Sequence, residues 1–160
     1  MIIRQAILED WPKIQHLNWQ IFEYELQVEP RSNLAFPYTD EAVNYFKKAA
    51  EGRDNHIAFV CEKDGVVVGY AIGKLIPAQE LTHRVGITLA QVHTLGVDKA
   101  HRGQGIGKQL IATVREWAVA NGANRLKIVA YAGNEIARSL YRRVGFHEFE
   151  VGYEQEIAKA

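Results

Sequence analysis

The sequence is poor in cysteine and serine, the residues that most often act as nucleophiles. Its 160 residues include one cysteine, Cys61, and two serines, Ser32 and Ser139. A single cysteine cannot form a disulfide within the chain, and Cys61 stands in the apolar run HIAFVCEK, which is typical of a small hydrophobic side chain in a strand. Neither serine lies in the Gly-x-Ser-x-Gly turn of a hydrolase, and the six histidines lack the spacing of a metal site, so we expect no metal.

An excess of charge and long apolar runs are also missing. Lysine and arginine together number 19, as do aspartate and glutamate. Because the chain has no net positive charge, we do not expect it to bind nucleic acid or a membrane surface. No segment approaches the ~20 apolar residues of a membrane span, and the N-terminus does not resemble a signal peptide. We therefore expect a single globular domain over residues 1–160 and a cytoplasmic location.

Hydrophobic periodicity predicts a mixed order of strands and helices. Apolar runs predict strands, two of them joined by a hairpin turn at Asp64-Gly65, over residues 1–7, 56–63, 66–76, 87–97, 125–131 and, as a final strand or two, 146–157. Apolar residues three and four apart predict helices over residues 10–26, 39–52, 106–121 and 134–143. The first helix carries a second apolar stripe, which we expect to meet another chain segment, a subunit or a substrate: Trp19, Phe22 and Leu26.

The stretch AHRGQGIGKQL, residues 100–110, places three glycines within five residues in front of a predicted helix. Such a loop aims backbone N–H groups and the positive end of a helix dipole at an anion, which is typical of a phosphate site. A Walker A loop would need glycine in place of Arg102 and a hydroxyl residue in place of Gln109. A dinucleotide fingerprint would need glycine in place of Lys108, so neither ATP nor NAD is the expected ligand.

From Arg102 the cluster reads Arg-Gly-Gln-Gly-Ile-Gly, which resembles the Gln/Arg-x-x-Gly-x-Gly/Ala motif of the GNAT superfamily of acyl-CoA-dependent N-acetyltransferases. The later stretch NEIARSLYRRVGF is similar to the family's second signature of Asn, Ala, Leu-Tyr and Gly-Phe. The resemblance covers the chain from about Val66 onward. It implies a mixed α/β fold with a twisted, mostly antiparallel sheet of six to seven strands, one parallel and splayed strand pair, and about four flanking helices.

The resemblance further implies acetyl-CoA as co-substrate, without a metal, and direct transfer of the acetyl group to a primary amine in a ternary complex. In the family the loop amides wrap the CoA pyrophosphate, a strand and a helix asparagine hold pantetheine, and a helix tyrosine is the general acid near sulfur. Gly96 is expected to ease a bulge in that strand, and Tyr141 matches the acid. The matching positions are Leu95, Gly96, Val97, Arg102, Gly103, Gln104, Gly105, Ile106, Gly107, Lys108, Asn134, Ala137, Tyr141 and, for a CoA phosphate, Arg143.

The sequence leaves alternatives open for the catalytic base and the acceptor. His93 is the first candidate for the base, since its ordinary pKa is near 6.5 and some family members place a histidine in this strand. Glu25, Glu80 and a water relay are the alternatives. Phe22, Glu25 and His93 would suit a cationic amine with an apolar body, in a small molecule or a peptide. A homodimer is the other partner considered, and a non-catalytic acyl-CoA-binding regulatory module is the alternative function.

Overall fold

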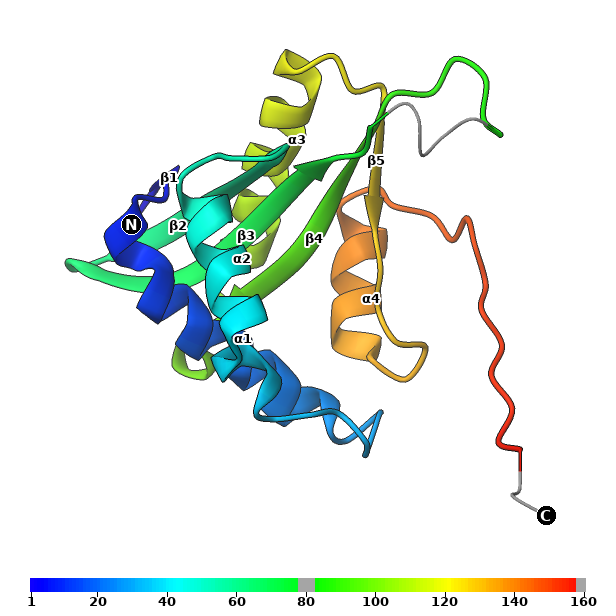
Figure 1. Cartoon of the computed structure of the whole chain (residues 1–160), viewed down its shortest axis with the longest axis horizontal. Coiled ribbons are helices and arrows are strands. Elements are labelled where there is room, and N and C mark those ends of the chain that lie inside the picture. The colour runs from blue at the N-terminus through cyan, green and yellow to red at the C-terminus, as the bar shows by residue number, and fades with distance from the viewer. Residues whose placement is uncertain (78–82, 158–160) are drawn as a thin grey trace.

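A computed structural model describes residues 1–77 and 83–157 and contains one five-stranded sheet (Figure 1). Neighbouring strands follow the chain order, with β1 to β4 antiparallel and β5 parallel to β4. The strands are β1 (Ile2–Gln5), β2 (His56–Lys63), β3 (Val66–Leu75), β4 (Leu89–Val97) and β5 (Arg125–Ile128). The mixed α/β fold expected from the sequence is confirmed.

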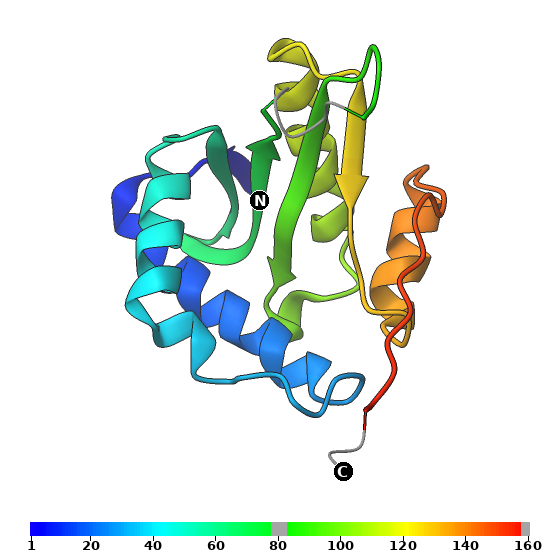
Figure 2. The ribbon, with the colours of Figure 1, turned by 45° about the vertical axis from the view of Figure 1, so that its right-hand side comes forward.

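Helices cover both faces of the sheet and one edge. The four α-helices are α1 (Trp11–Glu25), α2 (Asp40–Ala50), α3 (Ile106–Ala120) and α4 (Glu135–Arg143). One apolar core joins α1 and α2 to the sheet, and a second joins α3 to the opposite face. Figures 1 and 2 show α4 beside β5, outside these two layers. No helix in residues 1–77 and 83–157 is long and apolar enough to span a bilayer.

Local sequence signals account for the boundaries of these elements. Asp64 and Gly65 both have positive φ, 52° and 78°, as a two-residue hairpin turn requires. The Thr39 side chain accepts a hydrogen bond from the backbone N–H of Ala42 and so caps α2. Gly122, at φ 79°, follows the last turn of α3, where a left-handed residue ends a helix. Cys61 is fully buried in the core beneath α3, as its apolar surroundings predict.

A β-bulge in β4 lies at His93. Ile72 of β3 pairs with Thr94 and Gly73 pairs with Val92, so His93 is the extra residue. The expectation of a bulge near Gly96 is therefore wrong, because Gly96 pairs regularly with Tyr70. The bulge shifts the alternation by one residue, and His93 contacts Tyr45 of α2 while Val92 packs in the core beneath α3.

The parallel strand pair is splayed as expected. Pairing between β4 and β5 begins at Leu89 with Arg125 and ends at Val92 with Ile128. Beyond that point β4 continues to Val97, while the chain after β5 leaves the sheet and enters α4 (Figure 2). The last residues of β4 therefore have a strand neighbour on one side only, β3.

The described sheet has five strands instead of six or seven, because residues 146–157 form no strand. This segment is extended but joins no strand ladder, and Phe149 and Tyr153 are 68% and 96% exposed. It is tied to the body of the molecule by side chains, including the ion pair of Lys127 with Glu150. Alternating apolar residues favour a strand only where a partner edge is within hydrogen-bonding reach, and this segment lacks one.

Candidate functional site

The glycine loop forms an open cradle at the start of α3. Gly103 and Gly105 have φ of 77° and 80°, and no atom lies within 4 Å of where a Cβ would stand on either residue. Gly105 is also the N-cap of α3 and brings no side chain to the free N–H groups of the first turn. Backbone donors, open space and the positive helix end are what a pyrophosphate needs, so the loop fits that group.

The side chains around the cradle hold it in place. Ile106 is buried in the core beneath α3, so only its backbone can face a ligand. The Nε of Arg102 donates to the carbonyl of Val97 at 3.1 Å, and its guanidinium lies 5.7 Å from the centre of the Tyr24 ring. The Gln104 amide oxygen accepts a hydrogen bond from Lys63 at 3.4 Å. Lys108 is exposed in the first turn of α3, which follows the loop.

The turn between β4 and the loop is fixed to α1 by Gln20, which is 5% exposed. Its amide nitrogen donates to Asp98 at 3.1 Å, and its amide oxygen accepts from the backbone N–H of Lys99 at 3.0 Å. Asp98 also accepts from the backbone N–H of Ala100. Sequence reasoning missed Gln20 because no local pattern reveals a contact across 78 residues.

Asn134 begins α4, and its side chain is already used in part. Its Oδ1 accepts from the backbone N–H of Ala137 at 3.1 Å, and the residue is 7% exposed. The amide NH2 group is therefore the part of Asn134 left for a ligand. A Cβ on Gly107 would lie 3.1 Å from Leu140 and 4.0 Å from Leu95, so α4, the start of α3 and the free end of β4 meet at this corner.

Tyr141, one residue after Leu140, is within electrostatic range of Glu25 at the end of α1. Burial and the charge of Glu25 raise the pKa of Tyr141 to about 12. Burial also raises the pKa of Glu25 above its ordinary value. Burial raises the pKa of Tyr70 and of Tyr131, and the charge of the Glu25 carboxylate raises both further. The charge of the half-buried Glu25 thus acts on three tyrosines, Tyr70 in β3, Tyr131 after β5 and Tyr141 in α4.

His93 belongs to a different cluster, on the α2 side of the sheet. The Tyr45 hydroxyl is hydrogen bonded to Nδ1 of His93, and the rings are 5.3 Å apart. His56 lies 6.4 Å from the His93 ring. Burial, His56 and Lys74 lower the pKa of His93, so the imidazole is neutral at pH 7. The hydrogen bonds and ring contacts found for His93 within the described residues do not include Tyr141 or Glu25.

Buried polar residues that the sequence did not single out lie between these two clusters. Tyr70 is fully buried, and its hydroxyl accepts from the Asn18 amide at 2.8 Å. Thr94 faces the hydroxyls of Tyr45 and Tyr70, and its Oγ1 is a buried oxygen that lacks a hydrogen-bond partner among the described residues. Strand alternation alone predicts that Tyr70 is an apolar core residue. Only the packing shows that its hydroxyl lies among the polar groups of Asn18, Thr94 and Tyr45.

Two of the three arginines on α4 are neutralised by carboxylates. Arg138 is paired with Glu148 at 2.6 Å and with Glu135 at 3.2 Å, and Arg142 is paired with Glu135. Arg143 contacts the Ser139 hydroxyl at 3.4 Å and forms no ion pair within the described part of the chain. Its charge is the one available to a phosphate.

Of the residues expected near the acceptor, Phe22 and Glu25 both lie near Tyr131, and His93 does not. Phe22 stacks on Phe36 at 5.7 Å and lines a shallow hollow of about 490 Å³ with Glu29 and Tyr131. Glu25 lies near that same Tyr131, whereas His93 lies in the separate cluster above. Glu80 lies outside the described residues. Within the described ranges, no three His, Cys, Asp or Glu side chains are arranged to hold a metal ion.

Comparisons with known proteins identify the family of this chain. The model of the acetyltransferase (GNAT) family matches residues 11–146. An uncharacterized N-acetyltransferase of Methanocaldococcus jannaschii is 34% identical over 107 residues, which are 67% of this chain and 46% of that protein. This chain spans about half or less of the length of the curated relatives it matches.

Solved structures share the fold over almost the whole chain. A mutant of the BH1408 protein from Bacillus halodurans has a TM-score of 0.86 at 22% identity, over 99% of this chain and 100% of that one. The aminoglycoside N-acetyltransferase AAC(6')-Iy in complex with CoA has a TM-score of 0.71 at 19% identity, over 98% and 100% of the two chains.

Proposed function

Because this chain belongs to the acetyltransferase (GNAT) family, we propose that it transfers the acetyl group of acetyl-CoA directly to a primary amine within a ternary complex. The observation that carries the proposal is the corner where the glycine loop, α4 and the free end of β4 meet, with Tyr141 one residue after Leu140 and under the influence of the Glu25 charge. A proton donor, an anionic group and an open cradle for a pyrophosphate are what such a transfer needs, and these residues support the proposal.

Acetyl-CoA supplies an acetyl thioester, and residues from three elements of this chain would hold it. The cradle of Gly103, Gly105 and Gly107 receives the pyrophosphate, and Lys108 and Arg143 are the free cations near phosphate groups. The edge of β4 at Leu95–Val97 that faces away from β3 offers backbone groups to the pantetheine arm. The Asn134 amide NH2 and the backbone at Ala137 complete the site.

Acetyl transfer forms a bond between the amine nitrogen and the carbonyl carbon while the bond from carbon to sulfur breaks. Tyr141 donates its hydroxyl proton to the leaving sulfur. Its pKa of about 12 keeps this proton in place at pH 7 but also makes Tyr141 a weaker acid than a free tyrosine. A positioned hydrogen bond to the sulfur therefore has to offset the larger pKa gap to a thiol of about 8.5. The Glu25 carboxylate attracts the protonated amine and accepts its hydrogen bonds, and Phe22 and Tyr131 provide aromatic surface for the apolar part of the substrate.

His93 could take the amine proton in one tautomer only. If Tyr45 donates to Nδ1, the proton of the neutral ring is on Nε2, and the imidazole has no free basic nitrogen. If Nδ1 donates to Tyr45, Nε2 is free, and Tyr45 can donate to the unpaired Oγ1 of Thr94. We infer that His93 acts as the base in the second arrangement and that Glu25 binds the amine.

The test is release of free thiol from acetyl-CoA in the presence of a panel of small amines and peptide N-termini. Tyr141→Phe is expected to lower kcat by about 100-fold or more while the Kd for CoA stays unchanged. Tyr38→Phe, at a 54% exposed tyrosine, is the matched control and should leave both values unchanged. Binding of CoA without thiol release for any amine would instead favour the acyl-CoA-binding regulatory module.

The roles of His93 and Glu25 are separated by their pH dependence. His93→Ala should lower kcat below about pH 8, with recovery at higher pH as the free amine loses its own proton. Glu25→Gln should raise KM for cationic amines and leave KM for acetyl-CoA unchanged. A loss in His93→Ala that is the same at every pH would make His93 a structural residue.

A further inference from the structure

The glycine loop has an open conformation that depends on contacts at its two ends. No atom lies within 4 Å of where a Cβ would stand on Gly103 or Gly105, so the middle of the loop is not packed against other parts of the chain. At the far end, Ile106 is buried in the core beneath α3. The near end is the short 3-10 turn Lys99–His101, in which no residue is buried. This near end therefore needs a contact from another element to hold its position.

Gln20 of α1 supplies that contact. Its amide nitrogen donates to Oδ2 of Asp98 at 3.1 Å, and its amide oxygen accepts from the backbone N–H of Lys99 at 3.0 Å. The same nitrogen lies 3.3 Å from Nε2 of His16, so both ends of the amide are engaged. Gln20 is 5% exposed, and a buried amide that lost these partners would leave polar groups unpaired. These hydrogen bonds therefore keep the turn at a fixed place on α1.

Asp98 carries the contact from α1 into the turn. Its Oδ1 accepts from the backbone N–H of Ala100 at 3.0 Å and from Nδ1 of His101 at 3.1 Å, while Oδ2 accepts from Gln20. Burial opposes ionisation of this carboxyl, but the hydrogen bonds hold its pKa below the ordinary value. The ionised carboxylate thus binds donors of α1 and of the turn at the same time.

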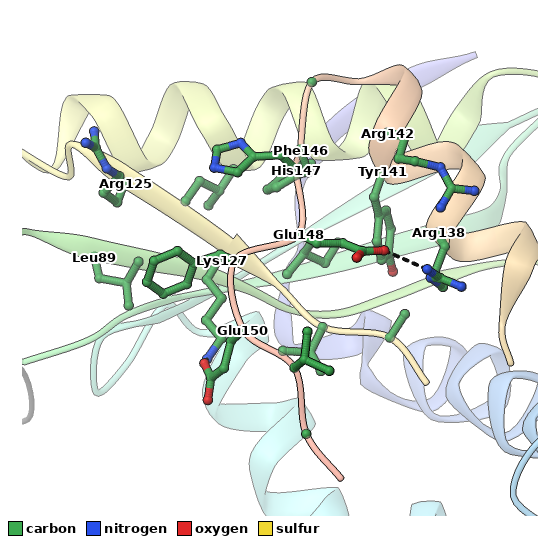
Figure 3. Close-up of a pocket in the computed structure, with 18 of the residues that line it drawn as sticks. Leu89, Arg125, Lys127, Arg138, Tyr141, Arg142, Phe146, His147, Glu148 and Glu150 are labelled. Atoms are coloured by element: carbon green, nitrogen blue, oxygen red, sulfur yellow. Dashed lines mark hydrogen bonds and ion pairs between the residues drawn. The ribbon is translucent and has the colours of Figure 1, made fainter. Parts of the chain in front are cut away.

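Helix α4 also lies beside the loop, but its contact with the loop is apolar. A Cβ on Gly107 would lie 3.1 Å from Leu140. The Arg138 side chain of α4 reaches Glu148 at 2.6 Å instead (Figure 3). Among the described residues, the hydrogen bonds of the α4 side chains do not include the turn at residues 99–101. The polar contact that fixes the near end of the loop therefore comes from α1.

We propose that Gln20, acting through Asp98, is the positioning residue of the pyrophosphate cradle and sets the affinity of the protein for CoA without taking part in acetyl transfer. A loop that must be ordered when a ligand binds lowers the affinity for that ligand, and Gln20 orders this loop beforehand. Gln20 acts indirectly, because its amide is engaged by protein groups. The inference rests on the proposed function, which assigns the CoA pyrophosphate to this cradle.

Calorimetric titration with CoA tests this role. Gln20→Leu removes the hydrogen bonds and keeps a side chain of similar size, so we expect it to raise the Kd for CoA by about 10-fold or more. Gln15→Leu is the matched control, since Gln15 is also on α1 and its amide donates to the backbone carbonyl of Pro37 at 3.0 Å. It should leave the Kd for CoA unchanged. An unchanged Kd in Gln20→Leu would overturn the proposal, and so would an equal rise in both variants.

Exchange of the amide and the carboxylate tests whether Asp98 is the partner through which Gln20 acts. Gln20→Glu alone sets two carboxylates side by side and should also raise the Kd for CoA. In the double variant with Asp98→Asn, the amide at position 98 can donate to the carboxylate at position 20, which still accepts from the Lys99 N–H. The double variant should recover most of the affinity that Gln20→Glu loses. Because it restores the contacts, it decides the matter even if Gln20→Leu does not fold, and no recovery would overturn the proposal.

Kinetics with a shortened donor separate positioning of the cradle from a general loss of structure. S-acetylpantetheine carries the thioester and the pantetheine arm but has no pyrophosphate. Gln20→Leu should raise KM for acetyl-CoA with kcat unchanged, and should leave kcat/KM for S-acetylpantetheine unchanged. An equal loss with both donors would overturn the proposal. If the unchanged protein binds CoA but releases no thiol with any amine, the proposed acetyl transfer fails, whereas the calorimetric result still decides the role of Gln20.

Discussion

We predict that position 96 tolerates no residue larger than glycine, because the Tyr70 ring occupies the space where a side chain would stand. A Cβ on Gly96 would lie 2.6 Å from Cε1 of Tyr70 and 3.1 Å from Cδ1 of Ile21. Tyr70 is fully buried and its hydroxyl is held by Asn18, so the ring cannot move away without breaking that hydrogen bond. Gly96→Ala should therefore cost about 1–3 kcal/mol of folding free energy, the usual range for an overpacked core.

A double-mutant cycle in urea tests this cause. Tyr70→Leu alone should cost about 2–5 kcal/mol, because it leaves a cavity. With Leu at position 70, the methyl group of Gly96→Ala has room, so the double variant should be less destabilised than the sum of the two, by about 0.5–3 kcal/mol. Gly152→Ala, where no atom lies within 4 Å of the added Cβ, serves as the control and should be nearly neutral.

Additive costs would refute the argument from space. They would mean that alanine at position 96 is harmful for a reason other than the Tyr70 ring. If Gly96→Ala leaves the stability unchanged, the Tyr70 ring and α1 shift readily. The fixed positions of the polar groups around Tyr70, from Thr94 to Glu25, would then lose their support.

Two more predictions concern the loop and the N-terminal ion pair. Gly105→Ala, at φ 80°, should cost about 1–2 kcal/mol of stability and weaken CoA binding measured by calorimetry. The control Gly122→Ala, at φ 79° after α3, should cost the same stability and leave the CoA affinity unchanged. Equal CoA affinities in the two variants would contradict the pyrophosphate cradle. Burial opposes ionisation of Asp10, but its hydrogen bonds from Arg4, at 2.7 Å and 3.1 Å, and from the Ile7 N–H hold its pKa below the ordinary value. The stabilisation by Asp10 is then present above the unfolded-state pKa near 3.9 and is lost as the pH falls through the lower folded-state pKa. In urea titrations, Asp10→Asn should therefore cost about 1–3 kcal/mol of folding free energy at pH 7 and progressively less below about pH 4.

Much of the fold follows from short stretches of sequence. The Asp64-Gly65 turn, the Thr39 cap and the end of α3 at Asn121-Gly122 depend on neighbours within a few residues, and all are where the sequence places them. The splay of β4 from β5 was expected through the family resemblance, not from residue patterns, and the pairing confirms it.

Other features were wrong or invisible in the sequence for a common reason. The bulge at His93 depends on how β3 and β4 are registered, and strand alternation is blind to one inserted residue. Residues 146–157 alternate like a strand, yet a strand also needs an edge to pair with. The contact of Gln20 with Asp98 joins residues 78 positions apart, which no local pattern records.

The sequence by itself determined the order of the elements up to α4 and, through the spacing of Gly103, Gly105 and Gly107, predicts a pyrophosphate as the anion the loop binds. These properties are local, because backbone dihedrals and hydrophobic periodicity act over a few residues. Only the tertiary structure decided which ionisable groups share a neighbourhood, since Glu25 comes to Tyr141 from α1 and His93 turns toward α2 at a bulge. Their proton affinities depend on burial and on charges brought near by folding, and these are set by the packing of distant segments.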